Sequence, residues 1–249
     1  MSFSHFIEVD SRLRSGDIFL EELHNFDFQN DKSKLVSFVN PFSYGVLARS
    51  ECIEYVDTLY SDGFLHCLLH RLFHWTWSFK RASFDYSSVA GPVFTYLESQ
   101  RLSVGLVGGT FDEVSKARCA IEARFPRVNI ATCRSGFFDN AAVMGEFIEH
   151  LNVDVVIVGM GTPRQELLGM RIKNRFHSGK LVYTCGGFIS QTALRDDYYA
   201  PLIKKLGLRW LQRCVMHSHV RRRVLIDYPV FVWKYCLFQV TRLVCARRF

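Results

Sequence analysis

Residues 154–166 read Asp154-Val-Val-Ile-Val158-Gly159-Met160-Gly161-Thr162-Pro163-Arg164-Gln165-Glu166. The apolar run at their start is typical of a buried strand, and the glycines after it let the backbone turn sharply and approach a ligand. We expect Thr162 to be the N-cap of the next helix, Pro163 its first residue and Gln165 the partner in a capping box. Such a junction is where α/β proteins bind nucleotides, because the helix start offers free N–H groups and a positive dipole end to phosphate.

The stretch does not match a dinucleotide-binding fingerprint. The third glycine of that pattern would fall at Arg164, and its acidic residue, about twenty positions on, would fall in the apolar run 181–184. The lysine-bearing phosphate loop is missing as well. We therefore expect a nucleotide or phosphate ligand with no preference for NAD or FAD, and the alternative that Thr162 and Gln165 only start a helix stays open.

The succession of strand, glycine turn and helix recurs along the chain. Strands are expected at 35–39, 55–60, 103–107, 128–132, 154–158 and 181–184. A helix is expected at 43–49, and two more are expected to end at residues 74 and 150. Two further helices are expected to begin at the capping box of Thr110 and Glu113 and after Thr162. This pattern predicts an α/β fold, a Rossmann-like parallel sheet with helices on both faces and a ligand crevice along the carboxyl ends of its strands. We expect the α/β domain over residues 1–200 and a basic, helical appendage over residues 201–249.

Composition bounds the remaining classes. With 249 residues, 49% of them hydrophobic, the chain can bury a large core. Its eight cysteines form no CxxC pair, so we expect reduced core cysteines of a cytosolic protein and no zinc site, and the first ten residues lack the pattern of a signal peptide. His66, His70 and His74 are spaced to share one helical face, but without an HExxH pattern they are expected to be surface or half-buried residues rather than metal ligands.

Positive charge is concentrated at the C-terminal end. Residues 201–249 hold eleven Lys and Arg against Asp227, a net charge of +10 in a chain whose total is +7. The apolar run 229–245 is interrupted by Lys234, Gln239 and Arg242, and so falls short of a spanning helix. It predicts either a basic, aromatic helix on an anionic membrane surface or a helix packed on the core with a solvated basic face. Nucleic acid is the weakest alternative, because no recognised binding module accompanies the charge.

Several motifs together resemble one family, the WecG/TagA/CpsF glycosyltransferases (glycosyltransferase family 26). They are Asn40-Pro41, Ser61-Asp62-Gly63, Val107-Gly108-Gly109, Phe125-Pro126 with Ser135-Gly136-Phe137-Phe138, residues 159–166, and Leu206-Gly-Leu-Arg-Trp-Leu-Gln-Arg213. Their order and spacing are specific and cover about residues 34–225. The resemblance implies a metal-independent, inverting enzyme without a cofactor. Such an enzyme moves a sugar from a UDP-sugar to a polyprenyl-diphosphate-linked acceptor, as a peripheral protein on the cytoplasmic face of the inner membrane. The family's C-terminal appendage is associated with membrane contact and completion of the active site.

Two departures from the family pattern leave the donor sugar open. The chain has Phe38 where the family often has threonine, and Ile189 where members acting on N-acetylmannosamine donors commonly have aspartate. The segments Arg81-Ala-Ser-Phe-Asp85 and Thr184-Cys-Gly-Gly-Phe188 are similar to relatives encoded with capsule or exopolysaccharide genes, whose donors vary. The resemblance therefore implies an N-acetylmannosamine-type sugar, glucose or a related hexose.

The implied chemistry assigns Asp62 as the catalytic base. Attack by a sugar hydroxyl needs a carboxylate to take the proton, and Asp62 stands at an expected strand end and matches the aspartate proposed as base in relatives. Asn40 would bind the donor sugar or orient Asp62. The alternatives remain a turn aspartate before Gly63 and a turn that simply ends a strand at Asn40.

The remaining site residues would hold the nucleotide-sugar and its phosphates. Gln165 and Glu166 would contact the uridine or the sugar, backbone N–H groups at the glycine turns would stabilise the leaving diphosphate, and arginines would bind phosphate or acceptor. The expected set is Gly108, Gly109, Gly136, Gly159, Gly161, Thr162, Pro163, Gln165 and Glu166 for the donor, and Arg81, Arg213 and Arg221 for phosphate or acceptor. A homo-oligomer is allowed, and the rival function is a non-catalytic nucleotide-binding or scaffold protein of a membrane complex.

Overall fold

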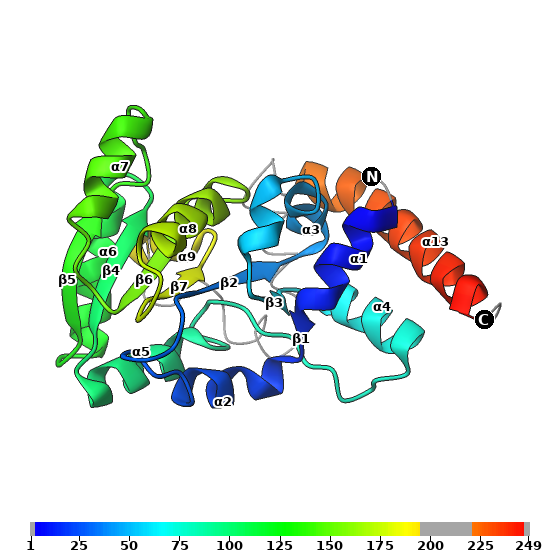
Figure 1. Ribbon diagram of the computed structural model, residues 1–249, viewed down its shortest axis with the longest axis horizontal. Helices are drawn as coiled ribbons and strands as arrows, with labels where there is room; N and C mark the ends of the chain where they lie inside the picture. The colour runs from blue at the N-terminus through cyan, green and yellow to red at the C-terminus, as the bar shows by residue number, and fades with distance from the viewer. Residues whose placement is uncertain (1–2, 195–220, 247–249) are drawn as a thin grey trace.

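The computed structural model describes residues 3–194 and 221–246, which form one parallel sheet wrapped by helices (Figure 1). In this part of the chain, seven strands pair in the order β1-β3-β2-β7-β6-β4-β5, every pair parallel. The strands are β1 (Leu13–Arg14), β2 (Lys34–Val39), β3 (Thr58–Ser61), β4 (Ser103–Gly108), β5 (Asn129–Arg134), β6 (Val155–Gly159) and β7 (Leu181–Thr184). The predicted Rossmann-like α/β fold is confirmed.

Helices cover both faces of the sheet, as the sequence predicts. The α-helices are α1 (Phe3–Arg12), α2 (Phe19–His24), α3 (Pro41–Leu47), α4 (Phe64–His74), α5 (Ala90–Gln100), α6 (Phe111–Arg124), α7 (Ala141–Glu149), α8 (Arg164–Arg175), α9 (Phe188–Leu194) and α13 (Tyr228–Ala246); the short turns are η1 (Gly16–Ile18), η2 (Glu51–Tyr55) and the π-helical η3 (Arg223–Asp227). Helices α2, α5, α6 and α9 bury side chains on one face, and α1, α3, α4, α7, α8 and α13 on the other.

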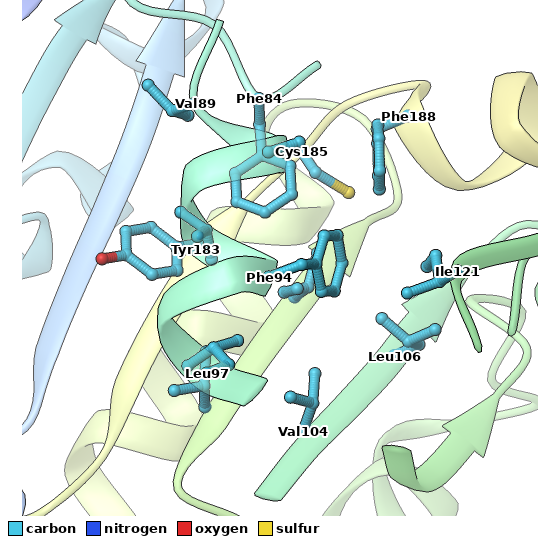
Figure 2. Close-up of a cluster of buried hydrophobic side chains, with 14 of the residues drawn as sticks. Phe84, Val89, Phe94, Leu97, Val104, Leu106, Ile121, Tyr183, Cys185 and Phe188 are labelled. Carbon is cyan, nitrogen blue, oxygen red and sulfur yellow. The ribbon is translucent and has the colours of Figure 1, made fainter. Parts of the chain in front are cut away.

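Strand β6 shows why the sheet is buried on both sides. Val155 and Ile157 point into one core layer, Val156 and Val158 point into the other, and all four are fully buried. A strand flanked by helices on both faces needs such a continuous apolar run rather than an alternating one. Figure 2 shows the first layer, where Phe94 of α5 lies over the sheet.

Two predicted starts, of one strand and of one helix, differ from the structure because capping side chains begin helices at other residues. The strand expected from residue 55 begins only at Thr58, since Ser50 accepts a hydrogen bond from the Cys52 N–H (3.3 Å) and starts the short helix η2. The helix expected from Ser43 begins two residues earlier, at Pro41, because Asn40 caps it. Strand β7 has the predicted bounds.

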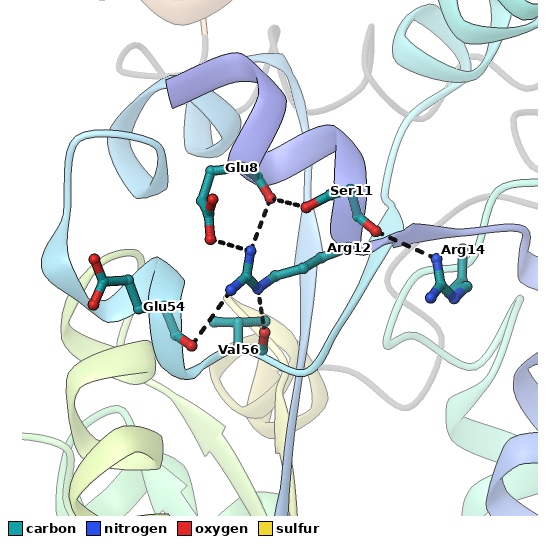
Figure 3. Close-up of polar contacts among 6 residues, drawn as sticks. All are labelled: Glu8, Ser11, Arg12, Arg14, Glu54 and Val56. Carbon is teal, nitrogen blue, oxygen red and sulfur yellow. Dashed lines mark hydrogen bonds and ion pairs between the residues drawn. The ribbon is translucent and has the colours of Figure 1, made fainter. Parts of the chain in front are cut away.

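Helix α1 is fixed to the sheet by an arginine at its last residue (Figure 3). The Arg12 guanidinium donates to the Val56 carbonyl (2.7 Å) and, within α1, to the carbonyl of Glu8 (3.1 Å) as well as to its carboxylate. Val56 lies two residues before β3, so the bond to its carbonyl ties the end of α1 to the segment that leads into β3.

Helix α13 packs into the core with one face and presents a second apolar face to solvent. Phe231, Tyr235 and Phe238 are buried against α1, α3 and α4, which confirms the predicted core-packed helix. The outer face differs from the expected solvated basic one, because its exposed side chains include Val230, Trp233, Leu237, Val240 and Val244. Across residues 3–194 and 221–246, no helix combines the length and the apolar composition needed to cross a bilayer.

Candidate functional site

Asp62 and Asn40 lie side by side at the carboxyl end of the sheet. Val39 of β2 pairs with Ser61 of β3, so the residues that follow them leave the sheet together, and the Asp62 N–H donates to the Val39 carbonyl (2.8 Å). A Cβ built on Gly63 would stand 4.0 Å from the Asn40 Cβ, and both Asn40 and Asp62 are half-buried. The sequence-predicted pair therefore converges on one point of the crevice.

Asn40 also has a local structural role. Its Oδ1 accepts from the N–H groups of Phe42 (3.0 Å) and Ser43 (3.1 Å), and the Ser43 Oγ accepts from the Asn40 N–H (2.9 Å). This reciprocal capping box starts α3 and fixes the Asn40 side chain beside Asp62. Contact of Asn40 with a donor sugar stays a prediction.

The glycines of the predicted set meet at the ends of β4, β5 and β6, on the other side of β7 from Asn40 and Asp62. Gly108 pairs with Gly159, and a Cβ on Gly108 would stand 2.4 Å from the Gly159 carbonyl oxygen. A Cβ on Gly136 would come 3.0 Å from the Gly108 Cα. Gly109 and Gly161 adopt left-handed φ values of 60° and 75°. Glycine is required here because three backbone segments approach one another closely.

The helix that follows β6 starts differently from the prediction. Helix α8 begins at Arg164, Pro163 takes the cap position after a cis peptide bond, and no side chain caps the helix. Thr162 instead donates its hydroxyl to the Glu166 Oε1 (3.2 Å), so the predicted Thr162 cap with Pro163 as first residue is wrong. The Gln165 amide donates to Glu166 (2.9 Å) and accepts from the Gly186 N–H (3.1 Å), which ties the turn after β6 to the turn after β7.

Glu166 forms the buried centre of this network. Its Oε1 also accepts from Ser37 of β2 (2.8 Å), and Ser37 accepts from Thr184 of β7 (2.9 Å). Glu166 is fully buried, and burial raises the pKa of its carboxyl group above the ordinary value against the hydrogen bonds that lower it. Its position beneath the turn makes it a support for the residues around Thr162. Contact of Glu166 with the donor stays a prediction.

The arginines predicted to bind phosphate or acceptor differ in how they lie relative to Asp62. Arg81 is half-buried, donates to Ser83 (2.5 Å), and lies next to Ala82, whose N–H donates to the Ser61 carbonyl (3.1 Å) beside Asp62. Arg221 is exposed, two residues before η3, which packs beside α3. Arg213 lies outside the described residues. The structure thus brings Arg81 to the Asp62 end of the crevice.

A cavity of about 400 Å³ opens at the opposite end of the sheet and is separate from this site. It lies between α2 and the first residues of β2, β3 and β7, and its polar lining includes Glu22, Lys34 and Tyr60. Ligands of open α/β sheets bind at the carboxyl ends of the strands, where Asp62 and the glycines meet. The amino-terminal cavity therefore does not define the candidate active site.

Of the three histidines of α4, His70 and His74 are half-buried, as predicted, and His66 is more deeply buried than expected. His66 is fully buried rather than on the surface or half-buried, and burial lowers its pKa to about 4. The rings of His70 and His74 stack with centroids 4.2 Å apart. In the part of the chain that the structure describes, no three His, Cys, Asp or Glu side chains are grouped to hold a metal ion.

Sequence reasoning missed Asp10, a buried acid on α1. Its carboxylate accepts from the Tyr44 hydroxyl (3.0 Å) and from the Gln239 amide (2.8 Å), and the His74 Nε2 is 3.7 Å away. These partners are 34 to 229 positions distant in the chain. No periodicity or motif around Asp10 could have indicated the cluster.

Known proteins share this sequence pattern. The model of the family described as "Glycosyl transferase WecG/TagA/CpsF family" matches residues 15–244. A relative from Shigella boydii, named UDP-Gal:alpha-D-GlcNAc-diphosphoundecaprenol beta-1,4-galactosyltransferase, is 39% identical over 81% of this chain and 85% of its own. A relative from Staphylococcus aureus (strain MW2), named N-acetylglucosaminyldiphosphoundecaprenol N-acetyl-beta-D-mannosaminyltransferase, is 29% identical over 53% of this chain and 51% of its own.

Proposed function

Because the chain belongs to the WecG/TagA/CpsF family of glycosyltransferases, we propose that it transfers galactose from UDP-galactose to N-acetylglucosamine carried on undecaprenyl diphosphate. The observation that carries this choice is the 39% identity to a galactosyltransferase over four fifths of the chain, against 29% over about half for a mannosaminyltransferase. Ile189 agrees with this choice, because members acting on N-acetylmannosamine donors commonly have an aspartate at this position, whereas here a buried isoleucine packs by the glycine edge. The product would enter cell-envelope, capsule or exopolysaccharide assembly.

Asp62 supplies the base in the proposed reaction. The acceptor hydroxyl oxygen forms a bond to the anomeric carbon, the bond from that carbon to the UDP oxygen breaks, and the hydroxyl proton goes to the Asp62 carboxylate. Attack from the face opposite UDP inverts the anomeric centre, so an α-linked donor gives a β-linked product. Asn40, which its capping box fixes beside Asp62, would contact the reacting sugar.

The leaving diphosphate would be held by backbone N–H groups and arginine. The start of α6 is already occupied by an anion, because the Glu113 carboxylate accepts from the Thr110 N–H (2.7 Å). The turn at Gly161 and Thr162 and the uncapped start of α8 are therefore the better phosphate site. Arg81 lies close to Asp62 and would bind the second phosphate or the acceptor diphosphate.

The same family membership leads us to propose peripheral attachment to the cytoplasmic face of the membrane. Trp233 and Leu237 on the outer face of α13 are 72% and 57% exposed, and Lys234 and Arg242 are exposed on the same helix. Large apolar side chains flanked by cations suit the surface of an anionic bilayer. A lipid-linked acceptor would reach the crevice from there.

Replacing both Trp233 and Leu237 with serine should lower binding to phosphatidylglycerol vesicles about tenfold or more, since each buried apolar side chain contributes roughly 1.5–3 kcal/mol. Cosedimentation measures the bound fraction. Deleting α13 would be a poor test, because Phe231 and Tyr235 belong to the core. Phe111→Ser is the matched control, since Phe111 on α6 is 71% exposed and lies off this surface. Unchanged cosedimentation of the double variant would contradict membrane attachment through α13.

The proposed function is tested by offering UDP-galactose, UDP-glucose and UDP-N-acetylmannosamine separately with N-acetylglucosaminyl-diphosphoundecaprenol and following lipid-linked product. We expect product from UDP-galactose. Transfer from another donor alone would keep the enzyme class and change the sugar. If no donor is used and calorimetry detects no UDP binding, the rival scaffold without a nucleotide would replace the proposal.

A further inference from the structure

His66 joins the strand that carries Asp62 to the C-terminal helix. It lies in the first turn of α4, and its Nδ1 is 3.0 Å from the Ser61 Oγ. Ser61 is fully buried at the end of β3 and directly precedes Asp62. Because burial lowers the pKa of His66 to about 4, the imidazole is neutral at physiological pH and carries one ring hydrogen. The bond between His66 and Ser61 is therefore a neutral hydrogen bond inside the core.

Helix α13 forms one wall of the pocket that holds this imidazole. The ring centroids of Phe231 and Tyr235 stand 5.6 Å and 5.5 Å from that of His66, and both rings are nearly perpendicular to it, at 89° and 87°. Tyr44 of α3 completes the enclosure at 5.2 Å. In the described part of the chain, the His66 Nε2 has no hydrogen-bond partner. The Ser61 hydroxyl therefore orients the ring, and the aromatic wall holds it in place.

A second set of contacts fixes α13 at this position. Asp10 of α1 accepts from Gln239 of α13 (2.8 Å) and from Tyr44 (3.0 Å), and the Arg242 guanidinium is 3.8 Å from the same carboxylate. Burial would raise the pKa of Asp10, but the nearby His74 and the hydrogen bonds from Tyr44 and Gln239 hold it below the ordinary value. The charged carboxylate thus anchors α13 next to His66.

We propose that His66 is a positioning residue that transmits the docking of α13 to the catalytic base. With α13 in place, Phe231 and Tyr235 press on the imidazole, the imidazole fixes Ser61, and Ser61 sets the backbone from which Asp62 extends. His66 itself touches no substrate. This inference rests on the proposed role of Asp62 and deepens it, because it makes the geometry of the base depend on a helix that begins 166 residues later in the chain.

The test compares two substitutions of His66 in the full chain. His66→Asn keeps a polar atom near the position of Nδ1 and so preserves the bond to Ser61, whereas His66→Leu keeps volume and loses the bond. We expect His66→Leu to lower kcat about tenfold or more with KM for UDP-galactose little changed, because a small displacement of a reacting group costs rate more than binding. His66→Asn should recover most of that loss. Equal effects of both variants, or wild-type kcat in His66→Leu, would overturn the proposal.

Ser61→Ala removes the same bond from the other side and changes volume little, so it covers the case in which His66→Leu does not fold. The double variant should be no slower than the worse single one, because both substitutions remove one interaction. If the double variant instead lowered kcat by the product of the two single effects, the two residues would act separately, and the inference would be contradicted. The two proposals can fail separately. An active Asp62→Asn enzyme would refute the role of Asp62 as the base. An inactive Asp62→Asn enzyme together with a fully active His66→Leu enzyme would refute only the coupling of α13 to Asp62 through His66.

Discussion

Asp62→Asn should lower kcat about 10³-fold while UDP affinity stays within about twofold. Asparagine has the shape of aspartate and leaves the bond from the residue 62 N–H to the Val39 carbonyl intact, but it cannot take the acceptor proton. Initial rates of lipid-linked product formation give kcat, and isothermal calorimetry gives the UDP affinity. Loss of both activity and UDP binding would instead show that the substitution disturbs the crevice as a whole.

Asp27→Asn is the control that separates catalysis from turn structure. Asp27 is an exposed turn aspartate between α2 and β2, and its carboxylate accepts from the N–H groups of Gln29 (2.8 Å) and Asn30 (3.2 Å). It lies at the amino ends of the strands, away from the crevice. If Asp62 only shaped a turn, its substitution would resemble Asp27→Asn, with a small change in stability and normal turnover.

The parts of the fold predicted well from sequence are those fixed by neighbouring residues. Strand β7 has its predicted bounds because a short apolar run ends at glycines, and the Thr110–Glu113 capping box forms as expected because both partners lie within one helical turn. Thr162 shows the limit of such rules. The structure offers its hydroxyl the buried Glu166 carboxylate as acceptor, and the helix starts without a side-chain cap.

The residues of the candidate site also differ in whether the sequence could predict them. Asp62, Asn40 and the glycines could be predicted, since parallel strands bring their carboxyl ends to one edge whatever the order of pairing. Asp10 and the burial of His66 could not, because both depend on α13 returning to a surface formed by α1, α3 and α4. Of the two expectations for the C-terminal run, the structure confirms packing on the core, and contact with a membrane stays a prediction, because α13 is apolar on two faces and only one fits the core.

Gly108→Ala should destabilise the protein by about 3 kcal/mol, a decrease in Tm of about 9 °C. The added Cβ would stand 2.4 Å from the Gly159 carbonyl oxygen and 2.9 Å from the Ile189 Cδ1, so the ends of β4 and β6 must move apart. Thermal unfolding followed by circular dichroism measures the shift. UDP affinity should fall as well, because the same displacement moves the turn at Gly161 and Thr162 that we assign to the diphosphate.

Gly145→Ala is the matched substitution, since Gly145 lies on α7 with no atom within 4 Å of an added Cβ. Alanine should stabilise that helix by about 0.5–1 kcal/mol and leave UDP affinity unchanged. If Gly108→Ala were no less stable than Gly145→Ala, the close approach of β4 and β6 would be wrong. If it were destabilised yet bound UDP normally, the glycines would serve packing alone, and the diphosphate would have to be held by Arg81 and the C-terminal arginines instead.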